Sequence, residues 1–217
     1  MGSKILIVSG GTIEDTVVLG LLETNQYETV IACDSGMEFF QRNGCFPDMI
    51  LGDFDSVEPK TADYFREQSQ VQMEQFPAEK DWTDTELAVR RALEMRPERI
   101  DLVGATGSRL DHVLGNLQLL ALGLNAGVDM FLIDAHNRIR LIDSDLTLGR
   151  EDQYGDFVSL IPYGGTVCGL TLRGMKYPLE CATLTPDITL GISNEIVCEA
   201  AEISFETGKL FVIETKD

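Results

Sequence analysis

The hydrophobic pattern of the chain changes at about Asn137, and this change limits the folds that the chain can adopt. Before that point, short apolar runs alternate with longer amphipathic segments, which is typical of a parallel sheet covered by helices. After it, short alternating segments are separated by glycine turns, which is typical of an all-β sandwich. We therefore expect an open α/β sheet domain at residues 1–145, followed by a small C-terminal β-sandwich at residues 146–217.

The same pattern predicts individual elements. In the first part, strands are expected at residues 5–8, 29–32, 71–76, 99–103 and 129–133, with a further strand running into Asp53. Helices are expected around residues 39–40, at 61–69, at 83–95 and at 113–124, and Thr83 with Glu86 forms a capping box for the third of them. In the second part, strands are expected at residues 138–142, 157–162, 166–172, 188–192, 195–204 and 209–214.

Two pairs of aspartates lie at the expected ends of these elements. Asp53 and Asp55 stand two positions apart where a strand ends, so both carboxylates lie on one side of the extended backbone. Asp81 and Asp84 stand three positions apart at a helix start, which places them within one turn. Magnesium prefers such oxygen ligands, usually together with substrate phosphates. The sequence therefore indicates a magnesium–nucleotide site, with capping of turns and helices as the alternative role for each aspartate.

A glycine loop at residues 104–107 precedes the helix expected at residues 113–124. This order directs backbone N–H groups and a helix dipole towards an anion, and Arg109 can give a phosphate two hydrogen bonds. Alternatively, the glycines only form a turn, Arg109 is a surface residue and His112 is a polar cap. An earlier glycine loop, residues 9–12, lacks the dinucleotide fingerprint. Asp34 follows the second expected strand, where it either contacts a ligand or caps a helix.

Charge and cysteine content exclude several classes of protein. The formal net charge of −19 argues against binding of nucleic acid and of anionic membrane surfaces. The five cysteines show no zinc spacing and no C-x-x-C pair, which is typical of reduced thiols in a cytosol. The chain shows neither a signal peptide nor an apolar run that approaches the ~20 residues of a membrane helix. We therefore expect a cytoplasmic protein.

Four motifs in order give the chain a resemblance to a known family. They are Gly52-Asp-Phe-Asp-Ser56, Lys80-Asp-x-Thr-Asp84, Gly104-Ala-Thr-Gly107 followed by Arg109-x-Asp111-His112, and Gly191-x-Ser193-Asn194. With these motifs, and with an α/β half before a β half, the sequence resembles the thiamine pyrophosphokinases. It departs from the usual pattern at Ser35 and Ser108, where many members have glycine, and both replacements are small.

This resemblance implies a reaction and a set of site residues. The reaction is transfer of pyrophosphate from ATP to the hydroxyl of thiamine, which gives thiamine diphosphate and AMP and depends on Mg²⁺. The resemblance assigns the metal to Asp53, Asp55 and Asp81, and catalysis to the same three residues with Asp111. It assigns the nucleotide to Asp34, Lys80, Asp84, Thr106 and Arg109, and thiamine to Ser193 and Asn194. Asp111 is expected to hold Arg109 or a metal-bound water. For Ser193 and Asn194 the alternative role is a turn, because Ser-Asn is an ordinary turn composition. Family members are homodimers, with the site between the α/β domain of one chain and the β domain of the other.

Two other readings of the same residues remain. Asp53-x-Asp55-x-Val57 fits the motif of haloacid dehalogenase phosphatases, in which Asp53 would be the nucleophile. In those enzymes the motif follows the first strand, whereas here two strands precede it. The phosphatase reading also does not account for the β-rich second half of this chain. A sensor that binds thiamine or nucleotide on the same fold would lack the metal carboxylates, and this chain has all of them. The sequence therefore favours the enzyme.

Overall fold

The computed structural model describes residues 2–54, 57, 59–77 and 81–217. The chain divides into two compact units, Met1–Ala135 and His136–Asp217. Within the described residues, no helix is both long and apolar enough to cross a membrane. All five cysteines are free thiols.

The first unit is built on a parallel sheet. Its strands are β1 (Lys4–Val8), β2 (Thr29–Cys33), β3 (Met49–Gly52), β4 (Gln72–Gln75), β5 (Arg99–Val103) and β6 (Asp129–Ile133). They pair in the order β4-β3-β2-β1-β5-β6, and every pair is parallel. Leu6, Ile7 and Val8 of the central strand have no more than 1% of their surface exposed, because helices cover both faces of the sheet. The strands predicted for this part are confirmed.

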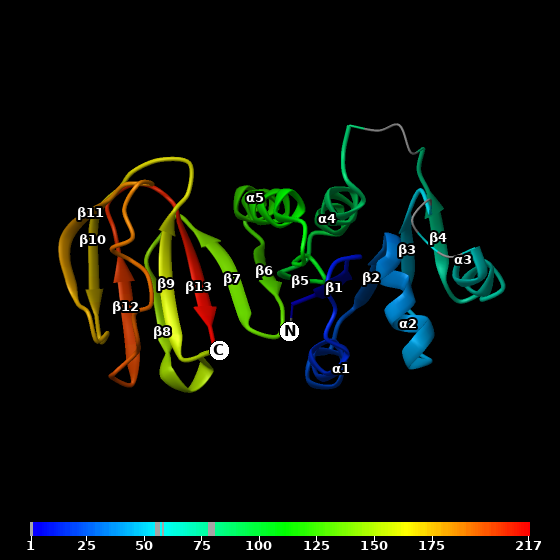
Figure 1. Cartoon of the computed structure of the whole chain (residues 1–217), viewed down its shortest axis with the longest axis horizontal. Helices are drawn as coiled ribbons and strands as arrows, with labels where there is room; N and C mark the ends of the chain where they lie inside the picture. Colours follow the sequence, from blue (N-terminus) through cyan, green and yellow to red (C-terminus); the bar gives the residue numbers. More distant parts are fainter. Residues whose placement is uncertain (1, 55–56, 58, 78–80) are drawn as a thin grey trace. The chain divides into compact units, whose positions relative to one another are not determined.

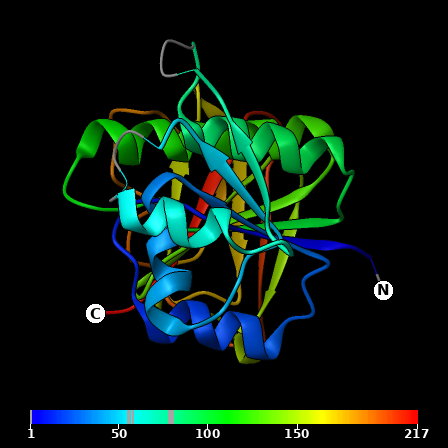
Figure 2. The same cartoon turned by 90° about the vertical axis from the view of Figure 1, so that its right-hand side faces the viewer.

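Helices cover the two faces of this sheet (Figures 1 and 2). They are α1 (Asp15–Thr24), α2 (Met37–Asn43), α3 (Pro59–Arg66), α4 (Asp84–Glu94) and α5 (Leu110–Ala126). Figure 1 shows α4 and α5 on one face and α1 and α2 on the other. The predicted cap of α4 is present, since the N–H of Glu86 donates to Thr83 Oγ1 at 3.2 Å. Helix α1 was not predicted, because its apolar residues surround the helix without a clear period and only Val18 is buried.

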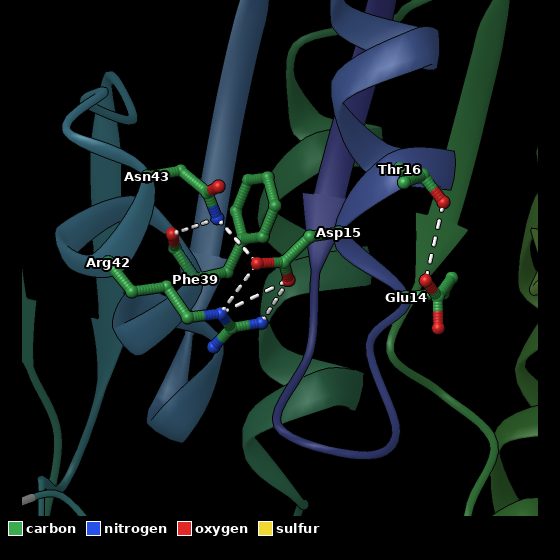
Figure 3. Close-up of polar contacts among 6 residues, drawn as sticks. All are labelled: Glu14, Asp15, Thr16, Phe39, Arg42 and Asn43. Carbon is green, nitrogen blue, oxygen red and sulfur yellow. Dashed lines mark hydrogen bonds and ion pairs between the residues drawn. The ribbon is translucent and has the colours of Figure 1, made fainter.

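The first turn of α1 is tied to the end of α2 (Figure 3). The carboxylate of Asp15 accepts hydrogen bonds from the guanidinium of Arg42 and, at 2.9 Å, from Asn43 Nδ2. Asn43 also donates to the carbonyl of Phe39 at 2.9 Å, which closes the last turn of α2. The hydrogen bond from Arg42 lowers the pKa of Asp15. These contacts fix the two helices on their shared face of the sheet.

The second unit contains two antiparallel sheets. One has the order β7-β13-β9, from β7 (Asn137–Ile142), β13 (Leu210–Thr215) and β9 (Phe157–Pro162). The other has the order β11-β10-β12-β8, from β11 (Leu179–Leu184), β10 (Val167–Arg173), β12 (Ala200–Ser204) and β8 (Leu146–Gly149). Buried Leu160, Val212, Leu170 and Ile203 form one hydrophobic core that draws on both sheets. The predicted β-sandwich is thus confirmed. The boundary expected after residue 145 falls between β7 and β8.

Two strand predictions for the second unit were wrong, and two strands were missed. Residues 188–192 form a loop, because their alternating side chains Ile188, Leu190 and Ile192 are all exposed and pack on no core. The strand expected at residues 195–204 begins only at Ala200. Strands β8 and β11 were missed: β8 lies in the acidic stretch that the sequence assigned to a boundary, and the exposed outer positions of β11 weaken its pattern.

Two buried carboxylates hold strands to neighbouring elements. In the first unit, Asp101 is fully buried and accepts hydrogen bonds from the Tyr27 hydroxyl at 2.7 Å and from Arg99 Nε at 2.8 Å. In the second unit, Glu214 of β13 has 1% of its surface exposed and is paired with Arg138 of β7 at 2.7 and 2.9 Å. Buried carboxylates need such partners, because an unpaired charge in the interior is costly.

Candidate functional site

A cleft of about 510 Å³ opens at the carboxyl edge of the parallel sheet. Strand β1 lies between β2 and β5, so the strand order reverses at this point, and open α/β sheets bind ligands in such a crevice. The cleft is lined by the residues that follow β1, β2 and β5 and by the first turns of α4 and α5. They are Ser9, Gly10, Gly11, Thr12, Asp34, Ser35, Thr83, Asp84, Thr85, Gly104, Ala105, Thr106, Gly107, Ser108, Arg109, His112, Val113 and Asn116.

The glycine loop after β1 serves to join two strands. The N–H of Gly11 donates to the carbonyl of Gly104 at 2.7 Å, and that of Thr12 donates to Thr106 at 2.7 Å. A Cβ atom on Gly11 would lie 2.3 Å from the carbonyl oxygen of Thr106, so only glycine permits this approach. Since these N–H groups bond to the loop after β5, they do not form a phosphate cradle.

The loop after β5 and the start of α5 have the features of an anion site. Helix α5 has 17 residues, and its N-cap residue, Arg109, makes no side-chain capping bond. The side chain of Arg109 therefore leaves the first-turn N–H groups uncapped, although the carboxylate of Asp111 bonds the N–H of His112. A helix start at a cleft suits an anion. Helix α5 also holds the loop after β5 in place, because Asn116 Nδ2 donates to the carbonyl of Ala105 at 2.8 Å and both residues are buried.

Arg109 adds a positive charge at the rim of this cleft. Its guanidinium donates two hydrogen bonds to the carboxylate of Asp111, at 2.7 and 3.3 Å. The bonds from Arg109 lower the pKa of Asp111 to about 2. Asp111 does not line the cleft, so its observed role is to hold Arg109.

Two aspartates that line the cleft, Asp34 after β2 and Asp84 at the start of α4, approach the end of β3. A Cβ atom on Gly52 would lie 3.4 Å from the backbone nitrogen of Asp34 and 3.5 Å from Asp84 Oδ1, so these three residues meet. Asp34 has a φ of +52° and Phe54, next to Asp53, a φ of +65°. Non-glycine residues in this left-handed region are uncommon and gather at functional sites, where the surrounding structure imposes them.

The structure brings together part of the predicted site. Asp34, Asp84, Thr106 and Arg109 line one cleft. Asp53 and Asp81 are described but do not line it, and Asp55 and Lys80 lie outside the described residues. Within the described ranges, no group of three or more His, Cys, Asp and Glu side chains is close enough to hold a metal ion. The chemistry of the expected donors, carboxylate oxygens at adjacent element ends, still fits Mg²⁺.

Several residues of the cleft carry no sequence motif. Ser9, Ser35, Thr85 and Asn116 were not predicted, because small polar residues acquire a role only from contacts distant in sequence. Ser35 Oγ donates to the carbonyl of Gly10 at 3.2 Å and joins the loops after β1 and β2. The buried thiol of Cys33 lies among these polar groups, and burial raises its pKa to about 12.

In the second unit, Ser193 and Asn194 lie at a turn. Ser193 has a φ of +55° and an exposed side chain. Asn194 is buried, and its amide accepts from the N–H of Tyr177 at 2.9 Å and donates to the Tyr177 carbonyl at 2.8 Å. The Asn194 side chain therefore locks the backbone here, which is the structural role considered for it, and contact with thiamine stays a prediction.

A parallel sheet with a cleft at its carboxyl edge, where the strand order reverses, places the first unit in the class of open α/β folds that bind ligands at that edge. Comparison with known proteins is more specific. The model of the thiamin pyrophosphokinase catalytic domain matches residues 21–132, and that of the thiamin pyrophosphokinase vitamin B1 binding domain matches residues 144–210. The chain belongs to the thiamine pyrophosphokinase family, and it is an enzyme of that type.

Individual relatives agree with this assignment. The thiamine pyrophosphokinase of Bacillus subtilis (strain 168) is 35% identical over 194 residues, which cover 89% of this chain and 90% of the relative. A crystal structure of thiamine pyrophosphokinase from Bacillus subtilis has a TM-score of 0.87 at 33% identity and covers 99% of this chain and 100% of that chain. That from Geobacillus thermodenitrificans has a TM-score of 0.84 at 31% identity and covers 99% and 98%. The predicted family and fold are confirmed, and the phosphatase alternative is set aside.

Proposed function

We propose that this enzyme transfers the pyrophosphoryl group of ATP to the hydroxyl of thiamine, giving thiamine diphosphate and AMP, and that the reaction requires Mg²⁺. The observation that carries this proposal is the cleft at the carboxyl edge of the sheet, with the uncapped start of α5 on one side and Asp34 and Asp84 on the other. A site with fixed N–H donors and Arg109 facing carboxylates suits a phosphate chain bound together with a cation.

Each group of residues then has a task. The first-turn N–H groups of α5 and the Arg109 guanidinium bind phosphate oxygens and stabilise the charge that builds on them during transfer. Asp111 keeps Arg109 in place, as their 2.7 Å contact supports. Thr106, Asp34, Asp84 and Lys80 orient the nucleotide, so that the β-phosphorus faces the thiamine hydroxyl. One of the nearby carboxylates accepts the proton of that hydroxyl.

Asp53, Asp55 and Asp81 are the residues that we propose to hold Mg²⁺. Bound Mg²⁺ would neutralise phosphate charge, which matters in a chain with a net charge of −19. The support for this assignment is the position of Asp53 directly after β3, next to Gly52, where Asp34 and Asp84 also converge.

We propose that the second unit supplies the thiamine contacts, through Ser193 and Asn194, and that the enzyme is a homodimer. Exposed apolar side chains support a partner surface on each unit. Leu110 and Leu114 at the start of α5 are 72% and 60% exposed, and Ile188 and Leu190, close to Ser193 in sequence, are 42% and 55% exposed. In the dimer, the first unit of one chain and the second unit of its partner would enclose the substrates. Five free thiols support a cytoplasmic location.

The proposal is tested by ³¹P NMR of the purified enzyme with ATP, Mg²⁺ and thiamine. We expect AMP and thiamine diphosphate to appear together, and neither to appear when thiamine or Mg²⁺ is left out. Binding of thiamine with ATP left intact would indicate a sensor, and release of inorganic phosphate without thiamine would indicate a phosphatase.

Asp81→Asn tests the metal assignment, because the substitution removes a charge with little change in volume. We expect it to abolish turnover and to leave the fold intact. Asp129→Asn is the matched control, since this exposed aspartate starts β6 at the opposite edge of the sheet and should leave turnover unchanged. Normal activity in folded Asp81→Asn enzyme would refute the assignment.

A further inference from the structure

Two buried hydroxyl groups bridge the floor of the cleft. Ser9 follows β1, and its Oγ lies 2.7 Å from Oγ1 of Thr85, the second residue of α4. Ser9 and Thr85 are 5% and 9% exposed, and both line the cleft. Cys33, at the end of β2, is fully buried and its thiol interacts with both hydroxyls. Residues that are distant in sequence therefore meet in one small polar cluster below the site.

Each end of this bridge is attached to a different wall of the cleft. On one side, the N–H of Ser9 donates to Val103 at 2.8 Å, and the following residues continue this bonding to the loop after β5. On the other side, Thr85 follows Asp84 directly in the first turn of α4. The Ser9–Thr85 bridge thus joins the segment after β1, whose backbone bonds to β5 and its loop, to the first turn of α4, which carries Asp84.

The apolar packing of α4 holds its first turn only indirectly. The apolar residues that α4 buries, Ala88, Val89 and Ala92, begin one turn after Asp84. Helix ends fray unless side chains hold them, and the Thr83 cap holds only the local backbone. A buried hydroxyl pair is directional, since its oxygens must stay within hydrogen-bonding distance to offset their loss of hydration. A hydroxyl pair therefore fixes the separation of the two walls more narrowly than apolar contact does.

We propose that Ser9 and Thr85 are positioning residues for the nucleotide: their hydroxyl bridge sets the distance between Asp84 and the phosphate-binding loop after β5. This inference rests on the proposed function, because it takes the cleft to be the nucleotide site. Neither residue is proposed to touch the reacting atoms. Their effect reaches the nucleotide through Asp84 and through the loop, and it should appear in nucleotide affinity before it appears in the rate of chemistry.

Thr85→Val removes the hydroxyl with almost no change in shape. We expect the KM for ATP to rise about tenfold, with less than about a threefold change in kcat and in the KM for thiamine. Thr85→Ser keeps the hydroxyl and should restore the KM for ATP. Ser9→Ala should raise it to a similar extent, and the double variant should be no worse than either single variant, because both remove the same bond.

Thr61→Val is the matched control. Thr61 of α3 is 4% exposed and donates to Gln41 Oε1 at 2.7 Å, so it also loses a buried hydroxyl bond, but it does not line the cleft. It should lower the melting temperature as Thr85→Val does and leave the KM for ATP unchanged. An equal rise in KM in both variants, or an unchanged KM in Thr85→Val, would overturn the proposal. If Thr85→Val does not fold, the KM for ATP of Ser9→Ala and of Thr85→Ser is compared with that of Thr61→Val in the same way.

Calorimetric titration of MgATP without thiamine separates this inference from the proposed reaction. The affinity should fall about tenfold in Thr85→Val, matching the rise in KM, even if ³¹P NMR finds no transfer to thiamine. Loss of transfer in the wild-type enzyme with intact MgATP binding would contradict the reaction alone. Unchanged MgATP affinity in Thr85→Val would contradict the positioning role alone.

Discussion

Replacing Asn116 by alanine should loosen the loop that we assign to phosphate binding. Asn116 is 8% exposed and its Nδ2 donates to the carbonyl of Ala105, which is 3% exposed. The variant leaves this carbonyl buried without its donor, and an unsatisfied buried polar group costs about 1–3 kcal/mol. We therefore expect the free energy of unfolding of the first unit to fall by about 2 kcal/mol, within the range for such a buried group.

Urea unfolding followed by tryptophan fluorescence measures this change in the first unit. Trp82 is the only tryptophan of the chain, so its signal reports the unit that contains Asn116. With a slope of about 2 kcal/mol per molar urea, a loss of about 2 kcal/mol lowers the midpoint by about 1 M. The KM for ATP should rise in parallel, because the loop after β5 loses its support from α5.

Asn125→Ala controls for the helix itself. Asn125 lies on the same helix but is exposed, so this variant gains the same helix propensity of up to about 0.7 kcal/mol and loses no buried bond. The midpoint of Asn116→Ala should therefore lie at least about 1 M below that of Asn125→Ala. Equal midpoints for the two variants would refute the reasoning, and so would an unchanged KM for ATP in a destabilised Asn116→Ala enzyme.

Three further outcomes are expected. Burial and Asp101 raise the pKa of Tyr27, so the folded state keeps a proton that the unfolded state loses above its ordinary pKa of about 10. The contribution of Tyr27 to the free energy of unfolding should therefore be fully present below about pH 10 and decrease above it. Tyr27→Phe should cost about 2 kcal/mol at pH 7 and make this decrease smaller. Urea midpoints measured across pH will show both effects. Arg138→Ala should cost about 3–5 kcal/mol, because it leaves the buried carboxylate of Glu214 without its cationic partner, and a midpoint shift no larger than that of Arg173→Ala, whose ion pair with Glu202 is exposed, would argue against this. EDTA should abolish formation of AMP from ATP and thiamine, and added Mg²⁺ should restore it.

The sequence predicted the parallel sheet because its strands are buried on both faces and read as continuous apolar runs. Prediction failed where a pattern was not matched by burial. Residues 188–192 alternate as a strand does, yet their apolar side chains are exposed in a loop. Conversely, β11 forms a strand although only Leu184 of its six residues is buried. In both segments, contacts from other parts of the chain decide the structure, and local periodicity does not record them.

The same limit applies to the site. Glycine loops follow both β1 and β5, and composition alone cannot tell which one faces a ligand. The distinction depends on where the N–H groups of Gly11 and Thr12 donate, and those acceptors belong to the loop after β5. Asp34, Asp84 and Arg109 were found because charged residues at element ends are conspicuous. Ser9 and Thr85 were not, since their pairing joins β1 to α4 across 76 positions of sequence.

The burial of Cys33 beneath the cleft makes the enzyme convenient to label. A thiol whose pKa is raised to about 12 stays protonated at neutral pH, and maleimides react with the thiolate. Cys181 and Cys198 are exposed and both belong to the second unit. A fluorophore attached through them would mark that unit and leave the floor of the cleft unmodified. With the partly exposed Cys45 of the first unit replaced, the chain could then report events in the second unit by fluorescence.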